Sequence, residues 1–505
     1  DDDDDELRAY VDIHGSGVRR TLPIKSSKFR RWAQHAIYRK TGSAVRPDVL
    51  KMVVDTLAAC AEFDDSSPEY PVSIRVATDP ATGFIYIDLC DDTWKAVEIK
   101  PREWSVIDEP PVRFRRSQSM HPLPVPERDG RFGELREFLN IKEDADFNLI
   151  CGALCCYLRP GYPYPIIVIQ GEASSAKSTA TKVLRRLVDP NKADLRDPPH
   201  KIDDLLVTTI HNHVITVENA SSISPILSDA LCRLATGAGT AKRGLYTNHE
   251  EVVINARRPV IMNGIEFSMR GDLASRAVFI ELQPIADRAV RDEEEFNQRY
   301  EAARPRIFGA ICDALAIGLS KIDSVHPERL PRMADFMRWG IACEDGFAVN
   351  EGDFERAYWR NTEALVLNVI EGDPVAVAVR EFAYRLHESE PTATREACYV
   401  DPDTKRFAEP RMFRGTVGAL LKRLADVVDE KTRTAKGWPG TGALLGKRIT
   451  RAAPMLRKAG VDVQRPQRKG QSRFIEVYAT ARPRDTDDPY GGLDPEDFLD
   501  GEGAP

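Results

Sequence analysis

The chain has 505 residues, which is more than one hydrophobic core holds because single cores stop growing near ~250–300 residues, so we expect two to four domains. Its 42% hydrophobic and 30% charged residues are typical of a soluble globular protein, and no apolar run approaches the ~18 residues that a membrane-spanning helix needs. The net charge of −8 does not exclude a nucleic-acid partner, because 14 acids lie at 1–6 and 485–505 and the rest of the chain carries +6.

The two ends of the chain differ from its body. We expect residues 1–6 and 481–505 to be acidic disordered tails. The first residue is Asp, so we expect a chain that was either cut from a longer one or given an engineered start. Because no signal peptide is visible, we expect a cytoplasmic protein. Nine cysteines, none at zinc-binding spacing, are expected to be free thiols in a reducing compartment.

Residues 7–125 are predicted to form a small α+β domain that serves as a collar or accessory unit. Apolar periodicity predicts helices at 29–40 and 46–63, followed by three strands within 72–99. The bases Arg30, Arg31 and Arg39 could contact phosphates, but we interpret them as a solvated helix face. The proline-rich segment 110–126 is predicted to be a linker.

A motif at residues 165–180 indicates the chemistry. An apolar β-branched run precedes a loop of small residues, and a helix begins at Lys177, which is the order of a P-loop nucleotide site. Small residues let backbone N–H groups approach phosphates, the ammonium spans the terminal phosphates, and the next hydroxyl holds Mg²⁺. The residues expected to bind the nucleotide are Gly171, Ser174, Ser175, Ala176, Lys177, Ser178 and Thr179.

One position of this loop is unusual, because Ala176 stands where such loops carry Gly. Alanine disfavours positive φ, so either φ is negative here or the loop is strained. The alternative interpretation of the motif is an ordinary small-residue loop with a solvated Lys177.

Further strands follow in the order that a P-loop domain requires. A buried run at 213–217 ends in Glu218, a run at 259–263 ends in Asn263, and a loop with Arg276 precedes a last strand that ends at 282. We therefore predict an α/β domain over 126–345, with the ligand at the carboxyl ends of the strands. Glu218 would serve Mg²⁺ and the attacking water; the alternative is a strand that ends in a polar residue by chance.

These motifs resemble those of the superfamily 3 helicases of the AAA+ class, which are replication helicases of viruses, phages and plasmids and include phage primase-helicases. The resemblance covers residues 130–290 and, more loosely, the C-terminal third. It implies a Walker A loop with Lys177, a Walker B acid at Glu218, a γ-phosphate sensor at Asn263 and an arginine finger, Arg276, donated to the next subunit. The family often has a second Walker B acid where this chain has Asn219, and Arg270 is the competing arginine.

The resemblance also implies partners. ATP and Mg²⁺ are the expected cofactors, single-stranded or forked DNA the substrate, and a homo-oligomeric ring, expected to be hexameric, the assembly. A hairpin before Asn263 would grip the DNA backbone with Lys242, Arg243, Tyr246 and His249. Bases in a glycine-rich loop are otherwise often simply solvated. No acid cluster of a primase is visible, so any priming would lie in a domain or protein upstream.

Residues 346–480 are predicted to form a helical segment and a winged-helix domain. Helical runs at 412–424 and 444–458 precede a basic hairpin, and nine bases face one acid between Lys447 and Arg473. We predict DNA contact rather than a protein-docking wing. The residues expected to contact DNA are Lys447, Arg448, Arg451, Arg468 and Lys469.

The sequence therefore predicts an ATP-dependent DNA helicase or translocase that works as a ring in the replication of a phage or mobile genetic element. The alternative is an ATP-switched DNA-binding regulator or defence ATPase that hydrolyses ATP without unwinding. A small-molecule P-loop kinase is disfavoured, because kinases need neither an arginine supplied by a neighbour nor a terminal winged helix.

Overall fold

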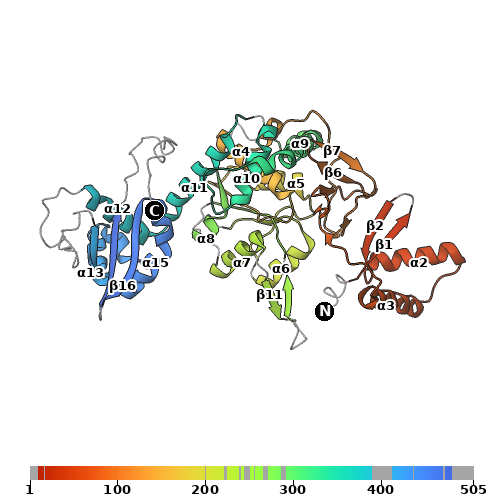
Figure 1. Cartoon of the computed structure of the whole chain (residues 1–505), viewed down its shortest axis with the longest axis horizontal. Helices are drawn as coiled ribbons and strands as arrows, with labels where there is room; N and C mark the ends of the chain where they lie inside the picture. Colours follow the sequence, from red (N-terminus) through yellow and green to blue (C-terminus); the bar gives the residue numbers. More distant parts are fainter. Residues whose placement is uncertain are drawn as a thin grey trace. The chain divides into compact units, whose positions relative to one another are not determined.

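The computed structural model describes residues 9–15, 18–199, 201–220, 224–237, 240–243, 251–254, 256–265, 271–285, 292–347, 349–388, 412–435, 437–469 and 472–479 (Figure 1). The chain divides into two units, one comprising Asp1–Phe267 with Arg276–Tyr358, and the other Ser268–Ser275 with Trp359–Pro505. Within the described residues no helix is long and apolar enough to cross a membrane. The eight cysteines described are free, and six of them are buried.

The first unit begins with a hairpin and two helices that share a core of their own. These elements are β1 (Tyr10–Gly15), β2 (Val18–Pro23), α2 (Ser27–Thr41) and α3 (Pro47–Phe63). The Ser26 side chain accepts from the Phe29 backbone N–H at the start of α2, and Gly42 ends it with a φ of 69°. Leu50 and Val54 of α3 are buried in this core. Both helices were predicted; the hairpin was not.

A second layer of the same unit is an antiparallel sheet of four strands. The strands of this region are β3 (Val72–Ser73), β4 (Val76–Thr78), β5 (Ile85–Asp88), β6 (Ala96–Lys100), β7 (Glu103–Ile107) and β8 (Arg113–Phe114), with β4 to β7 in sequence order. Trp104 of β7 donates its ring N–H to Asp313 at 2.7 Å, and the Arg102 N–H donates to the Ala316 carbonyl at 2.9 Å. This sheet is therefore fastened to the helix that contains Asp313.

The proline-rich segment 110–126 is also packed, unlike the linker that we expected. Met120 is buried, Arg115 donates to the Ile210 carbonyl at 2.5 Å, and the Pro122 carbonyl accepts from Arg304 at 2.9 Å. The segment therefore makes hydrogen bonds with the rest of the unit. In a free linker the same groups would be hydrogen-bonded to water.

The centre of the first unit is a parallel sheet, which confirms the predicted α/β class. It contains β9 (Ile166–Gly171), β10 (Ile215–Val217), β13 (Val260–Gly264) and β14 (Ala277–Leu282), in the order β10-β13-β9-β14. All neighbouring strands run parallel, with Val168 paired to Met262 on one side and Phe279 on the other. The continuous apolar runs noted in the sequence suit such a sheet, which is covered on both faces.

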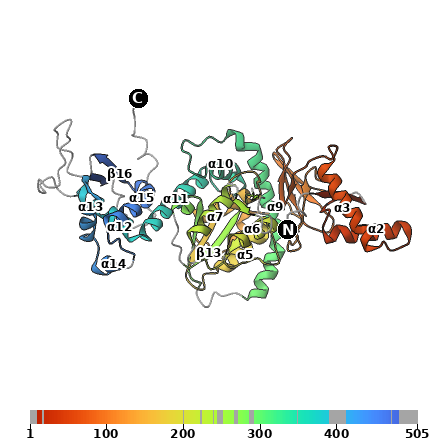
Figure 2. The same cartoon turned by 90° about the horizontal axis from the view of Figure 1, so that it is seen from below.

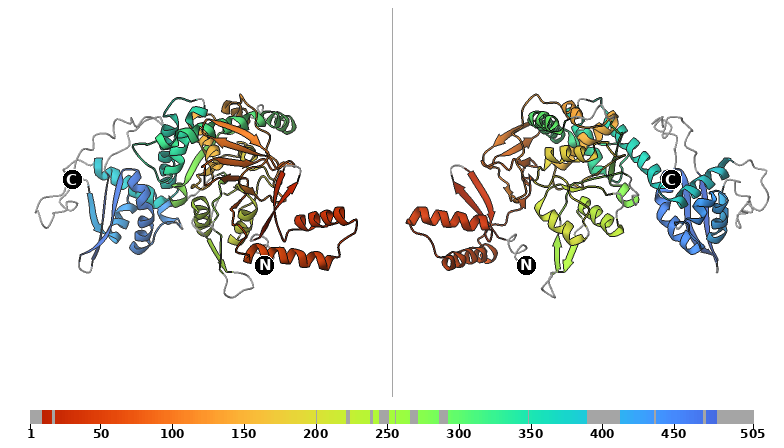
Figure 3. Two further views of the ribbon diagram at one scale, coloured as in Figure 1. Left: turned by 45° about the vertical axis from the view of Figure 1, so that its right-hand side comes forward. Right: turned by 180° about the vertical axis from the view of Figure 1, so that it is seen from behind.

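Helices α4 (Asp144–Tyr157) and α5 (Lys177–Val188) pack directly on strands of this sheet. The other helices of the unit include η1 (Phe132–Phe138), α6 (Ile202–His211), α7 (Pro225–Thr236), α9 (Glu293–Lys321), α10 (Ala334–Cys343) and the start of α11 (Asp353–Glu371). Helix α5 packs against β9 and β13 (Figure 2). Helix α9 is a single helix of 29 residues that contains Pro305. The predicted hairpin is present as β11 (Thr240–Arg243) and β12 (Glu251–Ile254), and it extends away from the parallel sheet (Figure 3).

The second unit joins helices to a three-stranded antiparallel sheet. Its elements are α8 (Gly271–Ala274), the end of α11, α12 (Pro374–Glu388), β15 (Met412–Thr416), α13 (Val417–Ala425), α14 (Glu430–Thr434), α15 (Gly442–Lys458), β16 (Val461–Lys469) and β17 (Ser472–Ala479). The sheet order is β15-β17-β16, and Leu420, Leu445, Leu456 and Val477 are fully buried in its core. The run at 412–416, predicted as helix, is strand β15; the helix starts only after Thr416, whose side chain caps it.

Candidate active site

The loop between β9 and α5 contains a glycine that no other residue can replace. A Cβ on Gly171 would lie 2.4 Å from the Leu282 carbonyl oxygen and 2.7 Å from the Ser175 hydroxyl oxygen. Both contacts are far below van der Waals distance, so β14 can pass this close to the loop only because Gly171 has no side chain.

The next part of the loop has a left-handed backbone at two residues that are not glycine. The φ angles are 61° at Ser174 and 63° at Ala176. Of the two alternatives for Ala176, the strained one therefore holds, and the cost is about 1 kcal/mol. The Ile285 N–H donates to the Ser174 carbonyl at 3.1 Å, and the Asn140 amide donates to the Ser175 carbonyl at 3.2 Å. These neighbours hold the loop in shape, and no sequence pattern had indicated Asn140.

Lys177 begins α5 and its ammonium lies across the loop. It donates to the Glu172 carbonyl at 2.6 Å and lies 3.4 Å from the Ser175 hydroxyl oxygen. Partial burial lowers the pKa of Lys177 below its usual 10.5. A cation at a helix N-terminus, beside a loop of close-packed backbone, is an arrangement that attracts phosphate.

The carboxyl end of β10 brings the predicted acid to this loop. The Ser178 hydroxyl donates to the Glu218 carboxylate at 2.5 Å, and the Glu218 N–H donates to the Arg196 carbonyl at 2.7 Å. The two groups predicted to serve Mg²⁺ are therefore neighbours although 40 residues separate them in sequence. Asn219, at the second acid position, has a φ of 52° and so turns the chain immediately after the strand.

Asn263 links the acid segment to α5. It is fully buried in β13, its amide oxygen accepts from the Asn219 N–H at 3.1 Å, and its amide N–H donates to the Thr181 hydroxyl at 2.9 Å. Thr181 in turn donates to the Lys177 carbonyl at 3.0 Å. These hydrogen bonds connect the segment of Glu218 with the first turn of α5.

Arg276 lies at the amino ends of the parallel strands, whereas the phosphate loop lies at their carboxyl ends. Its carbonyl accepts from the Ile166 N–H at 2.9 Å, at the beginning of β9, whereas Leu282 is paired with Gly171 at the end of that strand. About five strand residues, or about 17 Å, separate these two ends of the strands. The half-buried Arg276 is thus placed away from the loop of its own chain. Arg270, the competing arginine, lies outside the described residues.

The predicted DNA-contacting residues fall on two surfaces, one in each unit. Lys242 and Arg243 lie in β11 and are paired with Val252 and Glu251 of β12. Their side chains are not among the described parts of the structure, and Tyr246 and His249 lie outside the described residues. In the second unit Lys447 and Arg451 are exposed on α15, while Arg448 lies 3.5 Å from Asp373. The backbones of Arg468 and Lys469 belong to β16.

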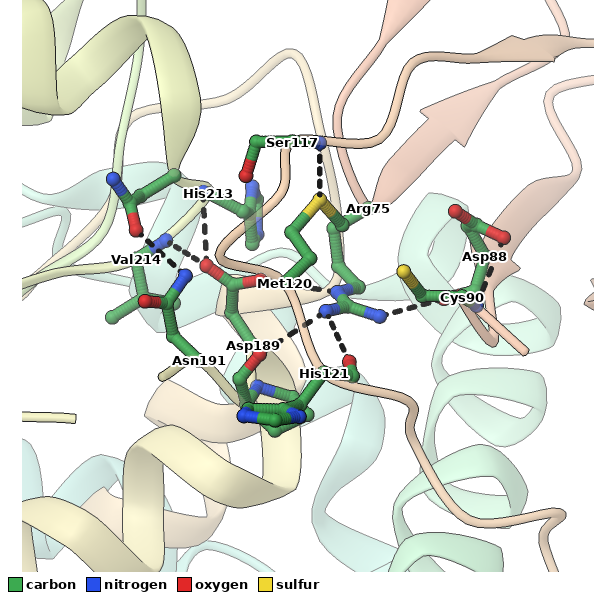
Figure 4. Close-up of polar contacts among 12 residues, drawn as sticks. Arg75, Asp88, Cys90, Ser117, Met120, His121, Asp189, Asn191, His213 and Val214 are labelled. Atoms are coloured by element: carbon green, nitrogen blue, oxygen red, sulfur yellow. Dashed lines mark hydrogen bonds and ion pairs between the residues drawn. The ribbon is translucent and has the colours of Figure 1, made fainter. Parts of the chain in front are cut away.

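Sequence reasoning missed a buried ion pair behind the site (Figure 4). Asp189 ends α5, and one of its oxygens accepts from the Arg75 guanidinium at 3.0 Å, while the other accepts the backbone N–H groups of His213 and Val214 at 2.9 and 3.0 Å. Burial alone would raise the pKa of Asp189, but the cations of Arg75 and Arg185 outweigh it and the pKa is lowered.

The other donors of Arg75 reach the Asp88 and His121 carbonyls at 3.1 and 2.9 Å. The N-terminal sheet, the end of α5 and the start of the strand that carries Glu218 are therefore joined through one carboxylate. The 114 residues between Arg75 and Asp189 leave no local signal of this pairing.

Comparisons with known proteins cover both units. The comparison with curated protein sequences gives no match. Among solved structures, SCCmec type IV Cch, described as an active helicase, is similar with a TM-score of 0.43 and 10% identity, covering 93% of this chain and 89% of that one. The C-terminal region of NrS-1, in an apo form, is similar with a TM-score of 0.39 and 12% identity, covering 94% and 96%.

Two family models match the sequence directly. Residues 134–357 match the replication protein of actinomycete integrative conjugative elements, and residues 399–488 match the C-terminal domain of the same RepA family. Over these two segments the chain is therefore similar to replication proteins of mobile genetic elements.

Proposed function

We propose that this protein is an ATP-dependent DNA helicase or translocase that works as an oligomeric ring in the replication of a mobile genetic element. The observation that carries the proposal is the meeting of Lys177, Ser178 and Glu218 at the carboxyl ends of β9 and β10. The family matches support replication as the process. An AAA+ ATPase domain of the superfamily 3 type is the architecture that we propose for this unit.

The residues present suit ATP with Mg²⁺. Backbone N–H groups of the strained loop would bind the phosphates, and Lys177 would supply the charge for the terminal ones. Ser178 and Glu218 would hold Mg²⁺, which neutralises charge on the transferred phosphoryl group when it is bound. Glu218 would also orient the attacking water. Asn263 would couple the position of the Glu218 segment to that of α5, because it is hydrogen-bonded to both Asn219 and Thr181.

The ring is proposed because Arg276 lies about 17 Å of strand from the loop of its own chain. An arginine at the amino ends of the strands serves catalysis only when it enters the site of a neighbouring copy, where it would stabilise charge in the transition state. Contacts of this head-to-tail kind generate closed rings when the rotation between subunits closes, and a hexamer is the ring that we propose.

DNA would be held by both units. In the first unit, Lys242 and Arg243 belong to β11 of the β11–β12 hairpin. Basic side chains bind DNA phosphates regardless of the nucleotide sequence. In the second, α13, α15 and the β16–β17 hairpin are proposed to form a winged helix, with Lys447 and Arg451 exposed on α15. Forked DNA in the cytoplasm is the proposed substrate, and a primase domain or protein upstream the proposed partner.

Strand displacement on forked DNA tests this function. The wild-type chain should hydrolyse ATP and separate the strands, and Lys177→Ala should do neither while remaining folded. Glu218→Gln should still bind ATP but hydrolyse it about 10²–10⁴-fold more slowly, because it loses the group that positions the water. Hydrolysis by the wild type without displacement would instead support an ATP-switched DNA-binding regulator.

A further inference from the structure

Helix α2 has an unusual charge pattern and lies outside both segments that match known families. Its 15 residues include five bases and no acid. All five are exposed, and within the described residues none forms an ion pair with a carboxylate; they are Lys28, Arg30, Arg31, Arg39 and Lys40. A solvated helix surface normally mixes both signs, because like charges one turn apart repel.

The exposed face of α2 is ordered. Lys28, Arg31, His35 and Arg39 follow one another at spacings of three and four residues, so they form one stripe along the helix. The stripe is about 16 Å long at the rise of an α-helix. Three of the five bases, together with His35, thus lie along one line of the helix, and Arg30 and Lys40 lie off it.

Two exposed aromatic side chains border this stripe on its two sides. Trp32 is 39% exposed and Tyr38 56% exposed. The opposite face, with Phe29, packs in the core shared with β1, β2 and α3 (Figure 1). The Trp32 ring stacks on the Phe29 ring, with centroids 5.7 Å apart, and part of it stays open to solvent. The core therefore holds the helix with its basic stripe toward solvent.

We propose that this α2 stripe binds single-stranded DNA. Its cations would contact successive phosphates, and Trp32 and Tyr38 would stack on unpaired bases. Cations alone would suit a duplex equally well; the exposed rings favour a single strand, whose bases are accessible. The proposal rests on the proposed function in taking DNA as the partner, but it requires neither ATP nor the phosphate loop.

The test measures binding of a fluorescent oligothymidylate to the full chain at several salt concentrations, without nucleotide. Because each phosphate contact on a single strand contributes about 0.7 to the slope of log K against log salt, the triple variant Lys28→Gln, Arg31→Gln, Arg39→Gln should lower that slope by about 2. Trp32→Ala with Tyr38→Ala should weaken binding about tenfold or more and leave the slope unchanged.

A matched control removes bases that the stripe does not contain. Arg46→Gln with Lys51→Gln, both exposed at the neighbouring α3, should leave affinity and slope as in the wild type. An unchanged slope in the triple variant, or an equal loss in the control, would overturn the proposal and point to an acidic protein surface as the partner of α2. A selective loss of duplex binding would also overturn it.

Failure of this inference is distinguishable from failure of the proposed function. If the wild type separates forked DNA and the α2 variants bind a single strand as it does, only the α2 stripe is refuted. If the triple variant has the smaller slope but the wild type does not hydrolyse ATP, the stripe stands and the motor does not. Lys177→Ala should retain the wild-type slope in either case.

Discussion

Arg75 and Asp189 form an ion pair at 3.0 Å in which neither side chain is exposed to solvent, and the pair joins the N-terminal sheet to the end of helix α5. The same carboxylate fixes the backbone N–H groups of His213 and Val214, just before the strand that ends at Glu218. The N-terminal sheet therefore helps to position the segment that leads to Glu218.

Removing one partner of this pair should be costly. Arg75→Met removes the cation that is hydrogen-bonded to the buried Asp189 carboxylate and leaves only Arg185 nearby, so we expect the free energy of unfolding to fall by about 3–5 kcal/mol. ATP hydrolysis should fall as well, because the start of β10 loses its anchor. Urea denaturation of the full chain, followed by tryptophan fluorescence, measures the first effect.

An exposed ion pair supplies the control for this experiment. Arg46 and Asp48 lie 2.7 Å apart with side chains 78% and 62% exposed. Arg46→Met should therefore cost less than about 1 kcal/mol. Equal losses in the two variants would contradict the role given to the buried pair.

Stability should also depend on pH through His213. Burial lowers the pKa of this imidazole to about 4, although Asp189 beside it acts in the opposite direction and Arg258 adds to the lowering. The unfolded chain, with an ordinary pKa near about 6.5, binds a proton before the folded chain does, so stability is complete above that value and is lost as the pH falls toward 4. Between about pH 7 and about pH 5 the loss should be about 2 kcal/mol.

The variant His213→Gln isolates this contribution. Glutamine cannot titrate but can still donate to the Tyr157 carbonyl, which lies 2.7 Å from the imidazole in the wild type. The difference between urea midpoints at the two pH values should shrink in the variant. An unchanged difference would show that other groups cause the acid sensitivity.

The sequence predicted the α/β sheet and the order of its motifs because these leave local signals. Apolar β-branched runs, a small-residue loop and polar residues at strand ends can each be read within a few positions, so Lys177, Glu218 and Asn263 could be named in advance. Their contacts could not, because the Ser178–Glu218 hydrogen bond depends on strand order.

Other features had no local signal or a misleading one. The Arg75–Asp189 pair joins residues far apart in the chain, and buried polar pairs have no periodicity. Pro305 lies inside α9, where a proline usually ends or kinks a helix, yet the helix continues past it and its second half is largely buried. Short runs such as β15 fit helix and strand equally well, and pairing with β17 decides between them.

The strained alanine of the phosphate loop predicts a stabilising substitution. Ala176→Gly should raise the free energy of unfolding by about 1 kcal/mol, because glycine adopts the φ of 63° without a steric penalty. Ala302→Gly, in the exposed face of α9, is the matched control and should lower it by about 1 kcal/mol. A loss in both variants would argue against strain at Ala176.

The bases of α15 are not equivalent, and this gives a prediction for the second unit. Lys447, Arg451 and Arg457 are all exposed, but Arg457 lies 3.5 Å from the Asp462 carboxylate, which offsets its charge. Lys447→Gln with Arg451→Gln should therefore lower the salt slope of duplex binding by about 2, at about 0.9 per phosphate contact. Arg457→Gln should change it little. Anisotropy titrations with duplex DNA measure both, and equal effects would count against α15 as the DNA surface.

The separation between Arg276 and the phosphate loop of the same chain predicts complementation between defective subunits. Arg276→Ala alone should hydrolyse ATP at least about 10³-fold more slowly, and Lys177→Ala alone should be inactive. When the two are mixed in equal amounts and allowed to reassemble, about one quarter of the subunit interfaces combine an intact loop with an intact arginine, because each contact is head-to-tail.

The mixture should therefore recover a measurable fraction of wild-type hydrolysis that neither variant has alone. Size-exclusion chromatography with light scattering establishes that mixed assemblies form, and Arg276→Lys, which keeps the charge but not the planar fork, should be nearly as slow as Arg276→Ala. Mixed assemblies without recovered activity, or full activity of Arg276→Ala alone, would remove this arginine from the neighbour's site. Recovery requires a loop on one subunit and an arginine on the next, since the strand register of a single chain holds the two at opposite ends of its strands.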